Sequence, residues 1–212
     1  MRFFPGGKRI GEDGTMIEKK EVIAFFDRLA PQWDAEMVRS DEIIGKILDN
    51  AGVKPGADVL DVATGTGVLI PDYLGRGVRS VTGIDLSPEM IRAARAKFSQ
   101  PNVTFLCGDV EEWAFDRQFD CVVVYNAFPH FPDPARLIGR LSALVRPGGT
   151  LTVAHGMSRE RINGCHQGPA SHVSMGLLPA EELARLFAAH LTVTRVLSDD
   201  RMYQVTGFRP AD

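Results

Sequence analysis

The chain has 212 residues, of which 44% are hydrophobic and 24% charged, and its formal net charge at pH 7 is −3. These values are typical of a globular protein with one domain, which needs no disulfide or metal to hold its core together. The slightly negative charge argues against a protein that binds nucleic acid through its phosphates.

The first segment, residues 1–16, is rich in glycine and charge, and we interpret it as a flexible N-terminal arm before a single domain at 17–212. It lacks the apolar stretch of a secretory signal. No apolar run approaches the roughly 20 residues of a membrane span. The cysteines, Cys107, Cys121 and Cys165, show no C-x-x-C spacing, so we expect a cytoplasmic protein without disulfides. Separately, we expect a monomer or a homodimer.

Two helices are predicted at the start of the domain. Apolar residues at helical spacing begin at Val22 and stop before Pro31, and a second set lies between Ile43 and Leu48, followed by Gly52. We interpret residues 17–52 as a helical lid over the rest of the domain.

Strands and helices then alternate along the chain. Ser87-Pro88 and Asp133-Pro134 are helix-start signals, each an N-cap residue followed by proline. The predicted strands are 57–62, 78–84, 103–106, 119–125 and 150–154, and the predicted helices are 66–74, 88–98 and a stretch around 137–145. Such alternation predicts a parallel sheet with helices on both faces.

The last third of the chain is less regular. Residues 146–149 predict a turn, and 159–178, with three glycines, predict a long loop. A helix at 181–190 is followed by two strands, 191–197 and 203–208, which form a hairpin. The fold class is therefore α/β, with a doubly wound, mostly parallel seven-stranded sheet, helices on both faces and an antiparallel edge hairpin.

The most informative segment is the glycine loop, Ala63-Thr64-Gly65-Thr66-Gly67, which follows a strand and opens a helix. Glycines there let the backbone approach a ligand, although a plain turn would also use them. Asp85, at the end of the next strand, is placed to hold both hydroxyls of a ribose. The segment therefore predicts a nucleotide-like ligand.

Two classes of ligand could bind at this loop. A nicotinamide cofactor favours a third glycine where this chain has Ile70, and Asp61 would repel its pyrophosphate. The acid suits instead a ligand with an ammonium and a sulfonium, which describes S-adenosylmethionine.

Four motifs occur in a fixed order: residues 61–67, 83–90, 108–111 and 144–151, with residues 26–34 upstream. Together they resemble the class I S-adenosylmethionine-dependent methyltransferases, and within them the ubiquinone/menaquinone-methyltransferase-like group. The resemblance covers roughly residues 22–208 and implies the Rossmann-like methyltransferase fold.

The resemblance also implies roles for matching residues. The methionine part of the cofactor would meet Asp61 and the loop that includes Ala63, Gly65 and Gly67, and the ribose would meet Asp85. The adenine would meet Met90, Asp109 and Val110. Leu86 and Asn126 complete the expected cofactor site. Two residues depart from the pattern: Ala63 stands where many members have glycine, and Trp33 where this group often has tyrosine.

Four of the five histidines fall between residues 130 and 172, after strands that should end at the crevice of the sheet. They could cap loops. His130 and His155 could instead act as a general base or orient the acceptor, and these two are our candidate catalytic residues. A third alternative is a metal site that includes His130, His155 and His166, although the spacing matches no standard motif.

The sequence therefore predicts a methyltransferase that acts on a small-molecule acceptor, with S-adenosylhomocysteine as product. A non-catalytic or regulatory protein that binds S-adenosylmethionine is the alternative, and an NAD-dependent oxidoreductase is a further one. We expect no nucleic-acid partner, because no basic stripe is present.

Overall fold

The computed structural model describes residues 17–165 and 170–211. Within them the chain forms seven strands: β1 (Asp58–Val62), β2 (Ser80–Asp85), β3 (Val103–Cys107), β4 (Phe119–Tyr125), β5 (Val145–His155), β6 (Thr192–Ser198) and β7 (Tyr203–Phe208). The helices are α1 (Lys19–Leu29), α2 (Trp33–Glu36), α3 (Asp41–Asn50), α4 (Ile70–Gly75), α5 (Pro88–Lys97), α6 (Pro134–Leu144), α7 (Arg159–Cys165) and α8 (Ala180–Ala188), with short 3-10 turns η1 (Phe128–His130) and η2 (Ser171–Val173).

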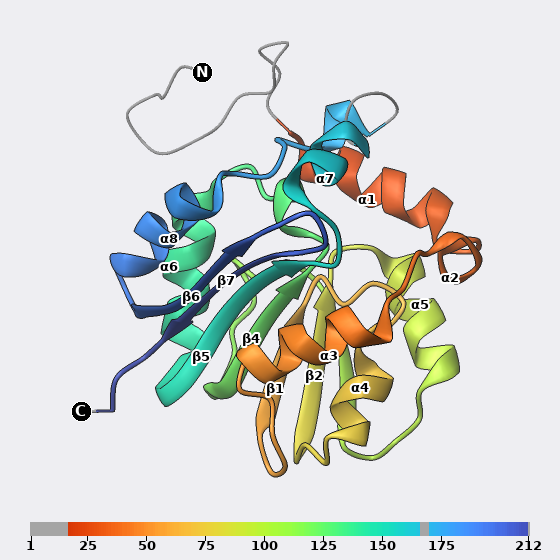
Figure 1. The fold of residues 1–212 in the computed structure, drawn as a ribbon. Helices are drawn as coiled ribbons and strands as arrows, with labels where there is room; N and C mark the ends of the chain where they lie inside the picture. Colours follow the sequence, from red (N-terminus) through yellow and green to blue (C-terminus); the bar gives the residue numbers. More distant parts are fainter. Residues whose placement is uncertain (1–16, 166–169, 212) are drawn as a thin grey trace.

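All seven strands belong to one sheet, in the order β3-β2-β1-β4-β5-β7-β6 (Figure 1). The first five strands of the chain pair in parallel, while β7 runs antiparallel to both β5 and β6. The predicted fold class, with its antiparallel edge hairpin, is confirmed.

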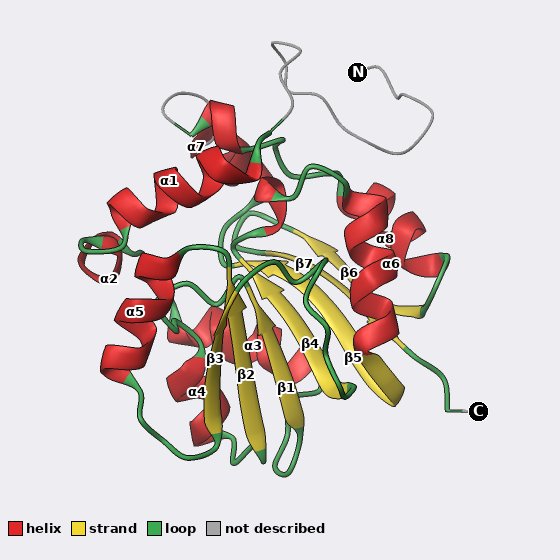
Figure 2. Cartoon of the chain, turned by 180° about the vertical axis from the view of Figure 1, so that it is seen from behind, coloured by secondary structure: helices red, strands yellow, loops and turns green. Residues whose placement is uncertain are grey.

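Helices cover both faces of the sheet, as predicted (Figure 2). On one face, α3, α4 and α5 bury a cluster with Val59, Val81 and Val123 of the central strands. On the other, α6 and α8 bury a second cluster with Leu60 and Val122. Successive strand residues point to opposite faces, so the continuous apolar runs of β1 and β4 fill both clusters.

The sheet has its switch point between β1 and β4. From β1 the chain builds outward through β2 and β3, then returns to place β4 on the other side of β1. Loops that leave the two sides in opposite directions open a crevice at the carboxyl ends of the strands. Helix α1 lies across this end of the sheet, in contact with α5 and η2 (Figure 2).

Three local predictions were wrong. The helix expected at 66–74 begins only at Ile70, because Gly65 and Gly67 have φ of 57° and 84°, which a helix cannot accommodate. The long loop expected at 159–178 contains α7, whose first turn is capped by the Ser158 hydroxyl, an acceptor for the Arg161 N–H at 3.2 Å. The turn at 146–149 lies inside β5, with Gly148 at φ 81°.

The expected lid divides into two parts. Helix α3 packs into the core through Ile44, Ile47 and Leu48, which are at most 1% exposed. The apolar face of α3 therefore packs against the sheet and is not available to a ligand. Only the stretch before it, with α1 and α2, reaches the crevice. The expected arm, residues 1–16, lies outside the described residues. Within the described part of the chain, the helices are all too short or too polar to cross a membrane.

Candidate functional site

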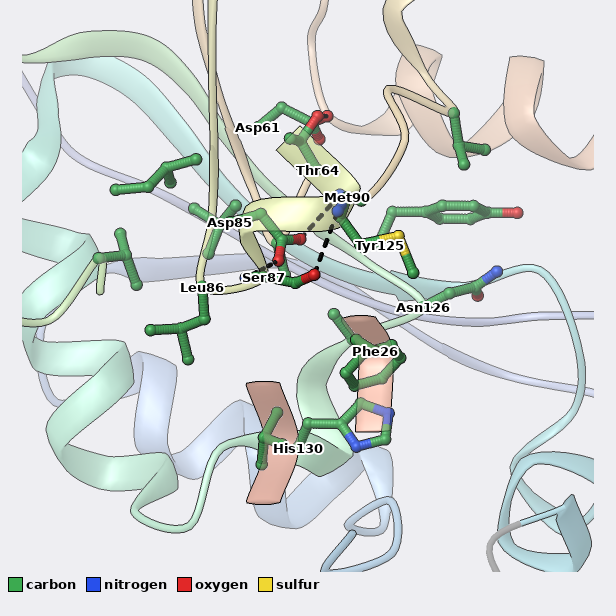
Figure 3. Close-up of a pocket in the computed structure, with 18 of the residues that line it drawn as sticks. Phe26, Asp61, Thr64, Asp85, Leu86, Ser87, Met90, Tyr125, Asn126 and His130 are labelled. Carbon is green, nitrogen blue, oxygen red and sulfur yellow. Dashed lines mark hydrogen bonds between the residues drawn. The ribbon is translucent and has the colours of Figure 1, made fainter. Parts of the chain in front are cut away.

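A large pocket opens at the carboxyl ends of β1, β2 and β4, beneath α1 and α2 (Figure 3). It encloses about 1020 Å³ of space between atoms, its open mouth included. Most of the expected cofactor residues line it: Asp61, Ala63, Gly65, Asp85, Leu86, Met90, Asp109, Val110 and Asn126. Gly67 is absent from the lining, and so is His155. The structure therefore brings together nine of the expected residues around one cavity.

The glycine loop is strained where it meets the pocket. Ala63 has φ 53° and Asn126, at the end of the neighbouring β4, has φ 54°. This left-handed region costs energy for any residue with a Cβ, and such strain concentrates at functional sites. Gly67 serves the loop differently: a Cβ on it would lie 2.7 Å from the Phe98 ring, so its role is to let α5 pack closely.

Asp85 ties the glycine loop to the end of β2. One carboxylate oxygen accepts from the N–H of Gly65 at 2.8 Å and the other from the N–H of Ser87 at 2.9 Å. Burial raises the pKa of Asp85 to about 6, against the lowering effect of these backbone donors. Each carboxylate oxygen has a second lone pair, so the group can still accept from hydroxyls in the pocket.

Asp61 is the most buried acid of the pocket, with 2% of its surface exposed. Its oxygens accept from the Thr64 hydroxyl at 2.5 Å and the Tyr73 hydroxyl at 3.1 Å. Burial, with the nearby Asp85, raises the pKa of Asp61 to about 7. A cationic group in the pocket would reverse this shift, because it favours the ionised carboxylate.

Asp109 follows β3 and is held from two sides. Its carboxylate accepts from the N–H of Glu111 at 2.9 Å and forms a salt bridge with Lys19, at the start of α1. Val110, next in the chain, is buried, as is Met90 on α5 across the pocket. A polar edge beside two apolar side chains suits a flat heterocycle with an exocyclic amino group.

His130 joins the pocket from η1. Its Nδ1 lies 2.7 Å from the carbonyl oxygen of Val173, and because a carbonyl only accepts, Nδ1 carries the proton. In the neutral ring the lone pair is then on Nε2. The imidazole meets Phe26 of α1 edge to face, with ring centroids 4.9 Å apart, and Phe26 in turn meets Trp33 at 5.7 Å. Among the described residues of the lining, His130 is the only histidine, and its ring packs against Phe26 (Figure 3).

His155 lies elsewhere, and our expectation that it faces an acceptor in the pocket was wrong. It is fully buried at the end of β5, where it pairs with Tyr203 of β7, and the two rings lie 6.0 Å apart. The hairpin extends the sheet past the expected strand end and covers this side chain. His166 is outside the described residues. Among those described, no three His, Cys, Asp or Glu side chains gather in a way that could hold a metal ion.

Several residues of the site carried no signal in the sequence. Tyr73 lies on the apolar face of a short helix, so its spacing indicates only core packing. Tyr125 ends an apolar strand yet lines the pocket, and burial raises its pKa. Lys19 is 90 residues from Asp109 in the chain, a pairing that no local pattern indicates. Two arginines of α7 do not line the pocket: Arg159 donates to the Leu177 carbonyl at 2.9 Å, and Arg161 is exposed.

Comparison with known proteins agrees with this geometry. A family model described as a methyltransferase domain matches residues 59–149. The malonyl-[acyl-carrier protein] O-methyltransferase of Acetivibrio thermocellus is 33% identical over 139 residues, 64% of this chain and 49% of that protein. The ubiquinone biosynthesis O-methyltransferase of Coxiella burnetii is 33% identical over 143 residues, 64% of this chain and 61% of that protein. The aligned part thus spans about half to three fifths of these relatives.

Solved structures share the fold. Magnesium protoporphyrin IX methyltransferase from Synechocystis PCC 6803, with bound S-adenosylhomocysteine, superposes with a TM-score of 0.68 at 16% identity, covering 91% of this chain and 100% of that one. The [4+2]-cyclase SpnF gives a TM-score of 0.73 at 17% identity, covering 92% and 97%. At such identities the likeness establishes the fold alone, because one fold carries different reactions.

Proposed function

We propose that this chain is a class I S-adenosylmethionine-dependent methyltransferase, which transfers a methyl group from S-adenosylmethionine to a small-molecule acceptor. The observation that carries the proposal is the charge of the pocket. Asp61, Asp85 and Asp109 line it, and no Lys or Arg of the described residues does. Three acids suit a ligand with an ammonium, a sulfonium and hydroxyls, and they would repel the pyrophosphate of a nicotinamide cofactor.

Each acid would hold one part of the cofactor. Asp85 would accept from the ribose hydroxyls with the lone pairs that its backbone donors leave. Asp109 would accept from the adenine amino group, and Met90 and Val110 would pack on the ring. Asp61 would face the ammonium of the methionine part. It lies beside Ala63, with a methyl side chain, and Gly65, with none, so the backbone there is accessible.

When bound, S-adenosylmethionine supplies a methyl group that is already activated by its sulfonium. The protein must therefore mainly align the acceptor and remove its proton. We assign proton removal to His130, because its Nδ1–H is fixed on the Val173 carbonyl and its Nε2 can accept. Phe26 and Trp33 keep water from the reacting atoms, which suits a transfer that neutralises charge.

Away from the acids, the lining of the pocket is largely apolar. It includes Val22, Ile23, Phe26, Met37 and Phe131, together with Tyr125 and Asn126, and we propose that the acceptor binds among these residues. Among the described residues, this lining has no Lys or Arg to balance the charge of an acceptor with a carboxylate or phosphate. We therefore propose an apolar or aromatic acceptor with one weakly acidic O–H or N–H.

We propose that residues 17–39 act as the cover of the pocket. Asp27 of α1 accepts from the Ser87 hydroxyl at 2.5 Å, which fixes α1 to the start of α5. Asp34 of α2 accepts from the Thr66 hydroxyl at 2.5 Å and pairs with Lys97 at 2.6 Å. These contacts hold the cover to the glycine loop, and their partly exposed side chains allow it to open.

Two measurements test the proposal in sequence. Calorimetry should detect binding of S-adenosylhomocysteine and S-adenosylmethionine, and none of NADH; the reverse result contradicts the cofactor assignment. Transfer of a radiolabelled methyl group to a panel of neutral phenols, amines and thiols should then identify acceptors. Binding without transfer to any acceptor would favour the non-catalytic alternative. A cytoplasmic location and a monomeric or dimeric state stay predictions from the sequence.

A further inference from the structure

The Tyr73 ring packs against apolar side chains, while its hydroxyl makes a polar contact. The side chain is fully buried among Ile44, Leu48 and Val59, in the cluster beneath α3 and α4. It is not part of the pocket lining. Its hydroxyl nevertheless reaches Oδ1 of Asp61, which does line the pocket, at 3.1 Å. Tyr73 thus contacts the site from behind, through one carboxylate.

Neutral donors hold this carboxylate. Thr64 donates to the second oxygen, Oδ2, at 2.5 Å, so each oxygen receives one hydroxyl. Among the described residues, no Lys, Arg or His forms a salt bridge with Asp61. Because hydroxyls stabilise a carboxylate without cancelling its charge, the negative charge remains available to a cation in the pocket.

The electrostatic surroundings oppose ionisation of Asp61. Burial and the charge of Asp85, from the end of β2, both raise its pKa, which is about 7, while the two hydroxyls lower it. The pKa of the Tyr73 phenol lies well above its usual value. It is raised by burial, by Asp61, and by Cys121 of β4 and Asp72 of α4. The phenol therefore keeps its proton and stays a donor across the neutral range.

We propose that Tyr73 is a positioning residue that fixes the Asp61 carboxylate in the pocket and keeps it ionised for a cationic ligand. The ligand would be the ammonium of the cofactor, so this inference rests on the proposed function. A lysine at position 73 would fix the carboxylate as well but would neutralise it. A phenylalanine would fill the same space but leave the carboxylate with one donor fewer.

The first test needs no ligand. In protein labelled with ¹³C at the aspartate carboxyls, the Asp61 resonance is identified by its loss in Asp61→Asn. Its titration midpoint should rise by roughly one pH unit in Tyr73→Phe, because a hydrogen bond to the charged form is lost. Thr64→Val should move it in the same direction, and it serves if Tyr73→Phe does not fold. An unmoved midpoint in both variants overturns the proposal.

The second test joins this shift to ligand binding. Calorimetry with S-adenosylhomocysteine should give Tyr73→Phe roughly fivefold weaker binding near pH 7, with wild-type affinity regained above about pH 8.5. A loss of affinity that is equal at every pH would mean that Tyr73 acts through packing, and would overturn the proposal. Tyr203→Phe is the matched control, because Tyr203 is also fully buried but lies outside the lining. Its pH profile should match the wild type.

The two tests separate the possible failures. Absence of S-adenosylhomocysteine binding by the wild-type protein contradicts the proposed function and the ligand assigned here. Normal binding with an unchanged pH profile in Tyr73→Phe contradicts this inference alone.

Discussion

Lys19, the first residue of α1, forms a salt bridge with Asp109, the acid expected to meet the adenine amino group. It also lies 3.1 Å from Glu112 and 3.8 Å from Glu111. One end of the proposed cover is therefore fixed to the part of the pocket that would hold the adenine. Opening of α1 and release of the cofactor should be coupled through this contact.

We predict that Lys19→Met speeds release of S-adenosylhomocysteine by up to about fivefold, because a partly exposed ion pair contributes at most about 1 kcal/mol. Stopped-flow fluorescence of Trp33, which lines the pocket, would measure the rate. Lys20→Met is the control, since Lys20 is exposed and pairs with Glu18 on the surface. Equal rates in the two variants would contradict the coupling.

Asp85 should matter to both binding and stability. Asp85→Ala removes the acceptor for the ribose hydroxyls, and hydrogen bonds to a charged group contribute about 1.5–3 kcal/mol each, so affinity should fall at least roughly tenfold. It also leaves the N–H groups of Gly65 and Ser87 without their acceptor, so Tm should fall by several degrees. Calorimetry and thermal unfolding check the two effects. Wild-type affinity in the folded variant would show that the motif assignment is wrong.

The pKa values of Asp61 and Asp85 predict the pH dependence of the ligand-free protein. Both are raised, to about 7 and about 6, above their value of 3.8 in the absence of the fold. At pH values between 3.8 and about 7, the folded state therefore binds more protons than the unfolded state. The free energy of unfolding should therefore fall as pH rises from about 4 to about 7.

Denaturant unfolding at several pH values would measure this slope, and Asp61→Asn should flatten it. Binding of a cationic ligand should release up to roughly one proton near pH 6.5, detectable as a dependence of the calorimetric enthalpy on the buffer. A free energy of unfolding that rises with pH over this range, or ligand binding without proton release, would contradict the raised pKa values of Asp61 and Asp85.

The strands and the motifs at their ends could be predicted from the sequence, because buried parallel strands are continuous apolar runs and the residues expected to hold the cofactor follow them in the chain. Contacts between distant segments could not. Tyr73 has the spacing of a core residue, and only its position against Asp61 gives its hydroxyl a role. The start of α4 was missed because the backbone at Gly65 and Gly67 is left-handed, which their sequence permits but does not require.

The position of His155 was missed for a topological reason. A histidine at the end of a central parallel strand points to a crevice when the strand ends there. Here β7 continues the ladder to the pair His155–Tyr203, and the side chain is buried. We predict that His155→Ala lowers Tm but leaves methyl transfer per folded molecule, and S-adenosylhomocysteine affinity, close to wild type. Loss of methyl transfer at unchanged Tm would show instead that His155 takes part in the reaction.

His130 gives the last prediction. If Nε2 removes the proton of the acceptor, His130→Ala should lower the rate of methyl transfer by roughly 10²–10⁴-fold, the usual contribution of a general base. Affinity for S-adenosylhomocysteine should change only a few-fold, because His130 is not among the residues that we propose to hold the cofactor. The rate of the variant should recover as pH rises, since hydroxide or an already ionised acceptor can replace the base.

The matched control is His190→Ala, because His190 is exposed beside Gly139 of α6, away from the pocket lining. Single-turnover transfer, measured at saturating cofactor, separates chemistry from product release. His130→Gln retains a side chain that can hydrogen-bond but cannot take up a proton. Equal rates in His130→Gln and the wild type would show that the ring only orients the acceptor, because a general base has to exchange the proton while a hydrogen-bonding group does not.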